Sequence, residues 1–173
     1  MFNLLKPNTL KTTAGYLVTL VSRYTPLKFQ KNHLEGIYNY LPISDRLCTS
    51  GQPSENQFEL IRAAGFNTVI NLAPHHVENA LPDEAGLLQS LGMTYWHIPV
   101  NFQNPTEENF QQFVDVMEQT RDQQVWLHCA ANMRASAFLY RYRRDVLKED
   151  TTIARQTMNR IWEPFGVWQD FIK

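Results

Sequence analysis

The residues with the clearest chemical potential lie in one short stretch, V-W-L-H-C-A-A-N-M-R-A-S, which runs from Val125 to Ser136. Four residues separate Cys129 from Arg134 in this stretch. The apolar residues before Cys129 predict a buried strand, and those after Arg134 have the spacing of a helix. Backbone amides in such a turn, at the N-terminus of a helix, can surround an anion. Two anions could use this site: the Cys129 thiolate and a phosphate in front of it.

A cysteine and an arginine in this arrangement could cleave phosphate esters. A thiol with an ordinary pKa of about 8.5 is mostly protonated at neutral pH, but a helix N-terminus can lower that pKa to roughly 3.5–7.5. The resulting thiolate can attack phosphorus and form a phosphocysteine. The guanidinium of Arg134 can hold two phosphate oxygens and stabilise the transition state. We therefore predict Cys129 and Arg134 as catalytic residues. The amides expected to bind the phosphate belong to Ala130, Ala131, Asn132 and Met133.

Asn132 and His128 are expected to shape this loop. Asn132 lies in mid-loop, where a left-handed backbone conformation is usual, and asparagine tolerates that conformation better than most residues. His128 is expected to orient the loop through hydrogen bonds, and a core histidine at the end of a strand is the alternative. For the whole stretch, the alternative is a structural cysteine after a strand and an arginine on a helix surface.

The overall composition is typical of one globular domain. The chain has 173 residues, of which 43% are hydrophobic and 12% aromatic, enough for a sizeable core. A net charge of -1 does not indicate a nucleic-acid binder. Two cysteines are too few for a disulfide framework and favour a reduced, cytoplasmic chain. We expect no membrane span, no metal and no cofactor.

The chain around the loop alternates between predicted strands and helices. Strands are predicted over residues 68–72, 94–100 and 124–128, and helices are predicted to begin at Ser54, Asp83 and Thr106. Pro99 favours an edge position for the second of these strands. The alternation predicts an α/β fold with a parallel-type central sheet flanked by helices. Ligands bind beyond the carboxyl ends of such strands, which would bring His75, His76, Asn101 and Cys129 near one another.

The first 35 residues are predicted to be an N-terminal extension with one helix, and residues 36–173 the main domain. The helix is expected to end at Pro26. Its apolar face, expected to pack on the core, consists of Leu17, Leu20, Val21 and Tyr24. Contact of this helix with a membrane surface is the alternative.

The stretch H-C-A-A-N-M-R-A-S resembles the H-C-x-x-G-x-x-R-S signature of cysteine-based tyrosine and dual-specificity phosphatases. The loop is one residue shorter, Asn132 replaces the glycine, and Ala135 follows the arginine where Ser or Thr is usual, with Ser136 one place later. The shorter spacing is more similar to the C-x-x-G-x-R-S loop of the phosphatase-like family called beta-lactamase hydrolase-like.

Three further motifs carry the same resemblance, in the same order. They are G-Q-P-S at Gly51–Ser54, A-G-F-N-T-V-I-N-L at Ala64–Leu72 and H-I-P-V at His97–Val100. The similarity covers about Leu34 to Val146. It implies a cysteine-phosphatase-like fold, hydrolysis of phosphate monoesters through a phosphocysteine, and a phosphorylated protein or small molecule as substrate. It also implies supporting roles for His128 and Ser136.

A general acid is missing from the place where related phosphatases carry an aspartate. That loop reads N-F-Q-N-P-T-E-E here, and the amides of Asn101 and Asn104 cannot give up a proton. General acid catalysis contributes about 10²–10⁴-fold, so we expect slow turnover, best on aryl phosphates. The candidate acids are Glu107, His75, His76 and Asp83, each of which an exposed loop or helix-start position also explains.

Two other functions remain open for the same loop. A rhodanese-like sulfurtransferase also places a cysteine among backbone amides, and a non-catalytic phosphate-binding module needs no acid. The second cysteine, Cys48, could form a reversible disulfide with Cys129, or it could be a buried residue of a strand.

Overall fold

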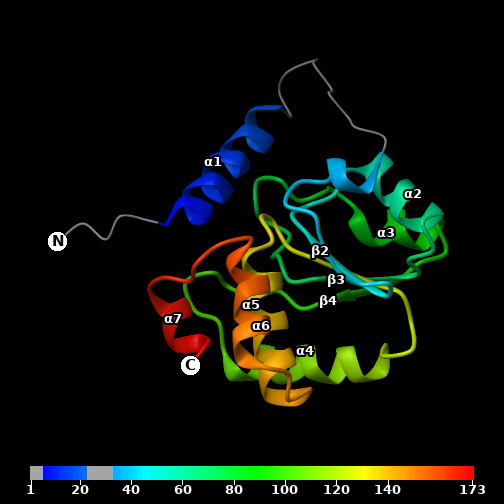
Figure 1. Cartoon of the computed structure of the whole chain (residues 1–173). Coiled ribbons are helices and arrows are strands. Elements are labelled where there is room, and N and C mark those ends of the chain that lie inside the picture. Colours follow the sequence, from blue (N-terminus) through cyan, green and yellow to red (C-terminus); the bar gives the residue numbers. More distant parts are fainter. Residues whose placement is uncertain (1–5, 23–32) are drawn as a thin grey trace.

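Five short strands form the central sheet of the computed structural model, which describes residues 6–22 and 33–173 (Figure 1). They are β1 (Leu41–Ser44), β2 (Leu47–Ser50), β3 (Thr68–Asn71), β4 (Thr94–His97) and β5 (Val125–His128). Their order is β1-β2-β5-β3-β4, and all neighbours are parallel except β1 and β2. The predicted α/β fold with a parallel-type sheet is confirmed.

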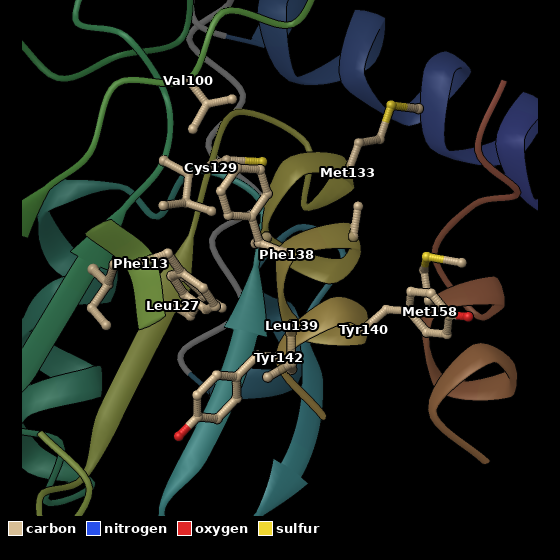
Figure 2. Close-up of a cluster of buried hydrophobic side chains, with 14 of the residues drawn as sticks. Val100, Phe113, Leu127, Cys129, Met133, Phe138, Leu139, Tyr140, Tyr142 and Met158 are labelled. Carbon is tan, nitrogen blue, oxygen red and sulfur yellow. The ribbon is translucent and has the colours of Figure 1, made fainter. Parts of the chain in front are cut away.

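Helices cover both faces of this sheet (Figure 1). On one face lie α2 (Glu55–Ala63) and α3 (Glu84–Ser90), which bury Phe58, Ile61 and Leu88. On the other side lie α4 (Glu107–Gln119), α5 (Met133–Arg141), α6 (Thr151–Asn159) and α7 (Val167–Phe171). Their core includes Phe113, Phe138 and Met158, and Figure 2 shows Met158 on the far side of α5 from Leu127 of β5. A 3₁₀ turn at Leu34–Gly36 precedes β1, and a π-helical turn at Tyr142–Val146 follows α5.

The predicted helix starts agree with the observed caps. Ser54 and Thr106 each accept a hydrogen bond from the backbone three residues later, in complete capping boxes, and Asp83 caps α3. β4 lies at the edge of the sheet, as Pro99 indicated. The strand ends at His97 and so is shorter than predicted, although the Ile98 and Val100 N–H groups still donate to the Asn71 and Leu72 carbonyls beyond its end.

The N-terminal helix α1 (Pro7–Ser22) packs on the rest of the protein through polar residues. The Thr12 hydroxyl donates to the Ile161 carbonyl at 2.6 Å, and the Glu163 N–H donates to the Thr9 hydroxyl at 2.9 Å. The predicted apolar contact face is wrong, because Leu17 and Val21 are 57% and 62% exposed. The reason is that α1 meets a segment that offers backbone groups, which hydroxyls satisfy. Two predicted positions, Tyr24 and Pro26, lie outside the described residues. No helix within the described part of the chain is long and apolar enough to cross a membrane.

Candidate active site

The loop after β5 has the conformation that its sequence predicts. Asn132 is the N-cap of α5 and has a φ of 66°, so the expected left-handed residue is present. Its side-chain amide donates to the Asn39 carbonyl at 2.8 Å and to the Thr49 hydroxyl at 2.9 Å. Asparagine thus supplies two bonds that a glycine at this position could not make.

The carbonyl groups of the loop are tied to segments outside it. The Ala130 carbonyl accepts from the Gln52 N–H at 3.2 Å and from the Asn79 side chain at 2.9 Å. The Ala131 carbonyl accepts from the Asn39 side chain at 3.0 Å. Carbonyl oxygens repel anions. Because these carbonyl oxygens point to hydrogen-bond donors outside the loop, the loop is suited to bind an anion.

Arg134 lies in the first turn of α5 and is 7% exposed. Its guanidinium carbon lies 5.2 Å from the centre of the Phe102 ring. The ion pairs found among the described residues do not include Arg134, and its Nε atom is buried without a hydrogen-bond partner. A buried cation without a carboxylate is unfavourable, so an anionic ligand would complete this environment.

Cys129 and Arg134 line one cavity of about 280 Å³. Figure 2 shows Cys129 at the end of β5, with Phe138 and Val100 around it. The walls come from four other parts of the chain. Among the described residues of these walls, Tyr16 is the only one with an ionisable group, its hydroxyl. The remaining lining residues are Thr13 and Tyr16 of α1, Val77, Phe102, Phe165, and the loop residues Ala130, Ala131 and Met133. The cavity therefore has a cysteine and an arginine at its base and mostly apolar walls.

His128 is fully buried and forms an ion pair with Glu84, at 3.1 Å between its Nε2 atom and Oε1. The Glu84 carboxylate also accepts from the side chains of Gln52 and Asn71. Burial raises the pKa of Glu84, but the charge and hydrogen bond of His128 outweigh burial and lower it to about 2. The Nδ1 atom of His128 has no hydrogen-bond partner within the described part of the chain. His128 thus links the loop to α3 through a buried pair.

The four candidate acids have other surroundings than the cavity lining. Glu107 forms a bidentate ion pair with Arg141, whose two terminal nitrogens donate to the carboxylate oxygens at 2.8 and 3.1 Å. Asp83 accepts a hydrogen bond from the Gly86 N–H as the cap of α3. His75 packs on His97, with 3.9 Å between ring centres, and His76 is exposed. None of the four is among the residues that line the cavity.

The loop that precedes α4 presents Phe102 to the cavity instead of an acid. Asn101 is exposed, and its side-chain oxygen accepts from the Gln103 N–H at 2.9 Å. The predicted supporting residue Ser136 is buried and donates to the Met133 carbonyl at 3.1 Å, within the first turn of α5. Its hydroxyl therefore stabilises the helix start.

Several residues in or near the site were not predicted from the sequence. Tyr16 lines the cavity from α1 and donates to the Glu78 carboxylate at 3.3 Å. Burial and the neighbouring Glu78 raise the pKa of Tyr16, so its hydroxyl stays protonated at neutral pH. Tyr38 donates to the Thr12 carbonyl and so ties α1 to the chain beside the loop. The sequence indicated a role for Glu84 only weakly, because an acidic residue at a helix start is usually explained by the helix dipole.

Cys48 is a buried residue of β2, which confirms the simpler interpretation of this cysteine. It belongs to the core beneath α2 and α3, whereas Cys129 belongs to the core on the opposite side of the sheet. Burial raises the pKa of the Cys48 thiol, and its sulfur lies 3.7 Å from the Tyr40 hydroxyl. Both cysteines are free thiols.

Comparison with known proteins agrees with this geometry. Residues 19–166 match the model of a family described as a DSP-PTPase phosphatase fused to NAD+ kinase. A beta-lactamase hydrolase-like protein of Agrobacterium fabrum is 32% identical over 96 residues, which are 54% of this chain and 22% of that protein. The chain thus spans less than a quarter of the length of that relative.

Solved structures show the same fold. A DUF442 phosphatase from Shewanella putrefaciens has a TM-score of 0.72 and 38% identity, covering 80% of this chain and 91% of that one. TpbA of P. aeruginosa, solved in complex with pTyr, has a TM-score of 0.59 and 18% identity, covering 70% and 72% of the two chains, and supports the fold alone. The chain therefore belongs to the cysteine-based phosphatases, in the family described as a DSP-PTPase phosphatase fused to NAD+ kinase.

Proposed function

We propose that the chain hydrolyses phosphate monoesters through a phosphocysteine intermediate. The observation that carries the proposal is the shared cavity of Cys129 and Arg134, where the arginine is buried and has no carboxylate partner in the described residues. An enzyme that binds a phosphate beside a nucleophilic sulfur needs this combination. The cavity walls suit the body of the substrate.

The reaction would proceed in two displacements. First, the Cys129 thiolate attacks phosphorus, the sulfur–phosphorus bond forms, and the ester oxygen leaves with its electron pair and takes up a proton. Water then attacks phosphorus, gives up a proton, and releases inorganic phosphate and the thiolate. Arg134 would hold two non-bridging oxygens in both steps, where charge spreads over the transferred group.

The leaving group limits the first step. No carboxyl or imidazole group from the described residues lines the cavity, so the proton on the leaving oxygen would come from solvent or from the weakly acidic Tyr16 hydroxyl. Phenols leave readily as phenolate anions, whereas alcohols leave poorly as alkoxides. A missing acid therefore slows the hydrolysis of alkyl phosphates by about 10²–10⁴-fold. Aryl phosphates should therefore react much faster than alkyl phosphates.

Aromatic and apolar walls favour the same class of substrate. Phe102, Phe165 and Val77 can contact an aromatic ring whose phosphate reaches Arg134. We therefore propose an aryl phosphate, on a protein or a small molecule, as the substrate.

Hydrolysis of p-nitrophenyl phosphate tests the proposal. Cys129→Ser and Arg134→Ala should each lower kcat/KM by about 10³-fold, because each removes a group that acts in the transition state. Glu107→Gln is the matched control and should stay within about twofold of the parent, since Glu107 contacts Arg141 outside the cavity. Rapid quenching should trap one phosphoryl group on the parent and none on Cys129→Ser. Equal rates for the parent and the two site variants would refute the proposal.

A phosphate-binding module without catalysis is the second candidate, and the missing acid favours it. Its signature would be tight binding of inorganic phosphate, lost in Arg134→Ala, with no turnover of any aryl phosphate.

A further inference from the structure

The polarity of α1 is inverted relative to that of an ordinary surface helix. The side that contacts the protein contains Thr9 and Thr12, both fully or almost fully buried. The outward side carries four large apolar residues that are 49% to 66% exposed: Leu10, Leu17, Val18 and Val21. An amphipathic helix normally turns its apolar side to the core. The outward stripe of α1 is therefore a surface that the described part of the chain leaves uncovered.

This stripe adjoins the mouth of the active-site cavity. Thr13 and Tyr16 of α1 line the cavity, and Leu17 follows them on the neighbouring side of the helix. Phe165, which lines the cavity from the segment between α6 and α7, is also 39% exposed. Two separate elements, α1 and the segment with Phe165, thus combine cavity-lining residues with exposed apolar side chains.

Positive charge accompanies the stripe. Lys6 and Lys11 are exposed at and near the start of α1, and α1 contains no acidic residue, although Lys6 forms an exposed ion pair with Glu163 at 3.8 Å. In the sequence, residues 1–34 contain five lysine and arginine residues and no aspartate or glutamate, although the whole chain has a net charge of -1. Basic charge is therefore concentrated in the part of the sequence that carries the apolar stripe.

We propose that the outward face of α1 binds the surface of an anionic lipid bilayer. An apolar stripe with flanking lysines is the surface that an interfacial helix presents, with apolar side chains among the acyl chains and cations at the anionic headgroups. Pairing of two α1 faces in a dimer would cover the stripe but would give Lys11 no anionic partner on the facing helix, because α1 contains no acidic residue. A bilayer of anionic lipid satisfies both the apolar and the basic residues.

This orientation would place the cavity mouth at the membrane surface. A phosphate ester held in the headgroup region, on a lipid or on a membrane-associated protein, could then reach Cys129 without crossing bulk water. This consequence rests on the proposed phosphatase function, whereas the binding of α1 to a bilayer does not.

Co-sedimentation of the whole chain with vesicles tests the binding. The parent should sediment with vesicles of phosphatidylglycerol and phosphatidylcholine, and at least about tenfold less with phosphatidylcholine alone. A variant with Leu17→Ser, Val18→Ser and Val21→Ser should bind the anionic vesicles at least about tenfold more weakly, because it loses the apolar contacts. Lys11→Glu should weaken binding to anionic vesicles and leave binding to neutral ones unchanged.

The matched control is Ile153→Ser, which changes a residue of α6 that is 57% exposed, as Leu17 is. It should bind vesicles like the parent. Thermal unfolding and p-nitrophenyl phosphate hydrolysis without vesicles should be nearly equal in all these proteins, which separates this test from the test of catalysis. The proposal is overturned if the parent does not bind anionic vesicles at low salt, or if the triple serine variant binds as tightly as the parent. A parent that is dimeric and binds no vesicles, with a monomeric serine variant, would overturn it in favour of a second copy.

Discussion

At the scale of single residues, Asn132 explains how a shortened loop keeps its shape without the usual glycine. Its backbone is left-handed, and its side chain bonds to Asn39 and Thr49. Glycine would satisfy the backbone alone, and alanine would satisfy neither requirement. One residue therefore combines a conformational and a bridging role.

Substitution of Asn132 separates these two roles. Asn132→Gly should lower the free energy of unfolding by about 1–2 kcal/mol, because the two hydrogen bonds are lost. Asn132→Ala should lose about 1–2 kcal/mol more, because the left-handed conformation is strained for alanine. Urea unfolding of the three proteins measures both differences. A glycine variant as stable as the parent would show that the side-chain bonds contribute nothing.

Glu84 is a buried carboxyl residue whose charge state affects stability at acid pH. Its pKa lies at about 2 in the folded protein, below the ordinary value of 4.5. A lowered carboxyl pKa stabilises the folded state fully above about pH 4.5, and this stabilisation is lost as the pH falls toward 2. The lost contribution is the pairing of Glu84 with His128.

The Glu84→Gln variant should lack this pH dependence. At neutral pH the parent should be more stable by up to about 3 kcal/mol, and the difference should shrink between pH 4.5 and 2. Urea unfolding at several pH values measures the two curves. Parallel curves for the two proteins would mean that the pair does not control acid stability.

At the scale of elements, α7 determines where the loop before α4 lies. The indole N–H of Trp168 donates to the Phe102 carbonyl at 2.8 Å, and the Trp168 ring packs on the Phe102 ring. Phe102 in turn lies over Arg134 in the cavity. A helix near the end of the chain thus positions a wall of the active site.

Trp168→Phe should loosen that wall. We expect KM for an aryl phosphate to rise several-fold and stability to fall by about 1–2 kcal/mol, because the Phe102 carbonyl loses its donor. Trp162→Phe is the matched control, since Trp162 is also buried but its N–H has no hydrogen-bond partner in the described part of the chain. If both variants raise KM equally, ring packing and not the hydrogen bond positions the loop.

At the scale of the whole molecule, the sequence predicted the features that depend on local patterns. Alternating strands and helices indicated the sheet, and the spacing around Cys129 indicated the loop. The contacts it could not predict join polar residues far apart in the chain, such as Thr12 with Ile161 and His128 with Glu84. Such contacts produce no periodic pattern in the sequence, because the sequence does not distinguish a threonine that donates to a carbonyl from a threonine that is hydrated. The position of α1 was mispredicted for this reason.

The outside partners of the loop carbonyls have a consequence for how the protein folds. The bonds of Ala130 and Ala131 to Asn79 and Asn39 span 51 and 92 residues of sequence. Contacts over such distances form late, because much of the chain must be ordered first. The anion-binding shape of the loop should therefore arise only in the final, cooperative stage of folding. The parallel pairing of β5 with β2 and β3 joins residues that are similarly far apart in the sequence, so the loop and the centre of the sheet should form together.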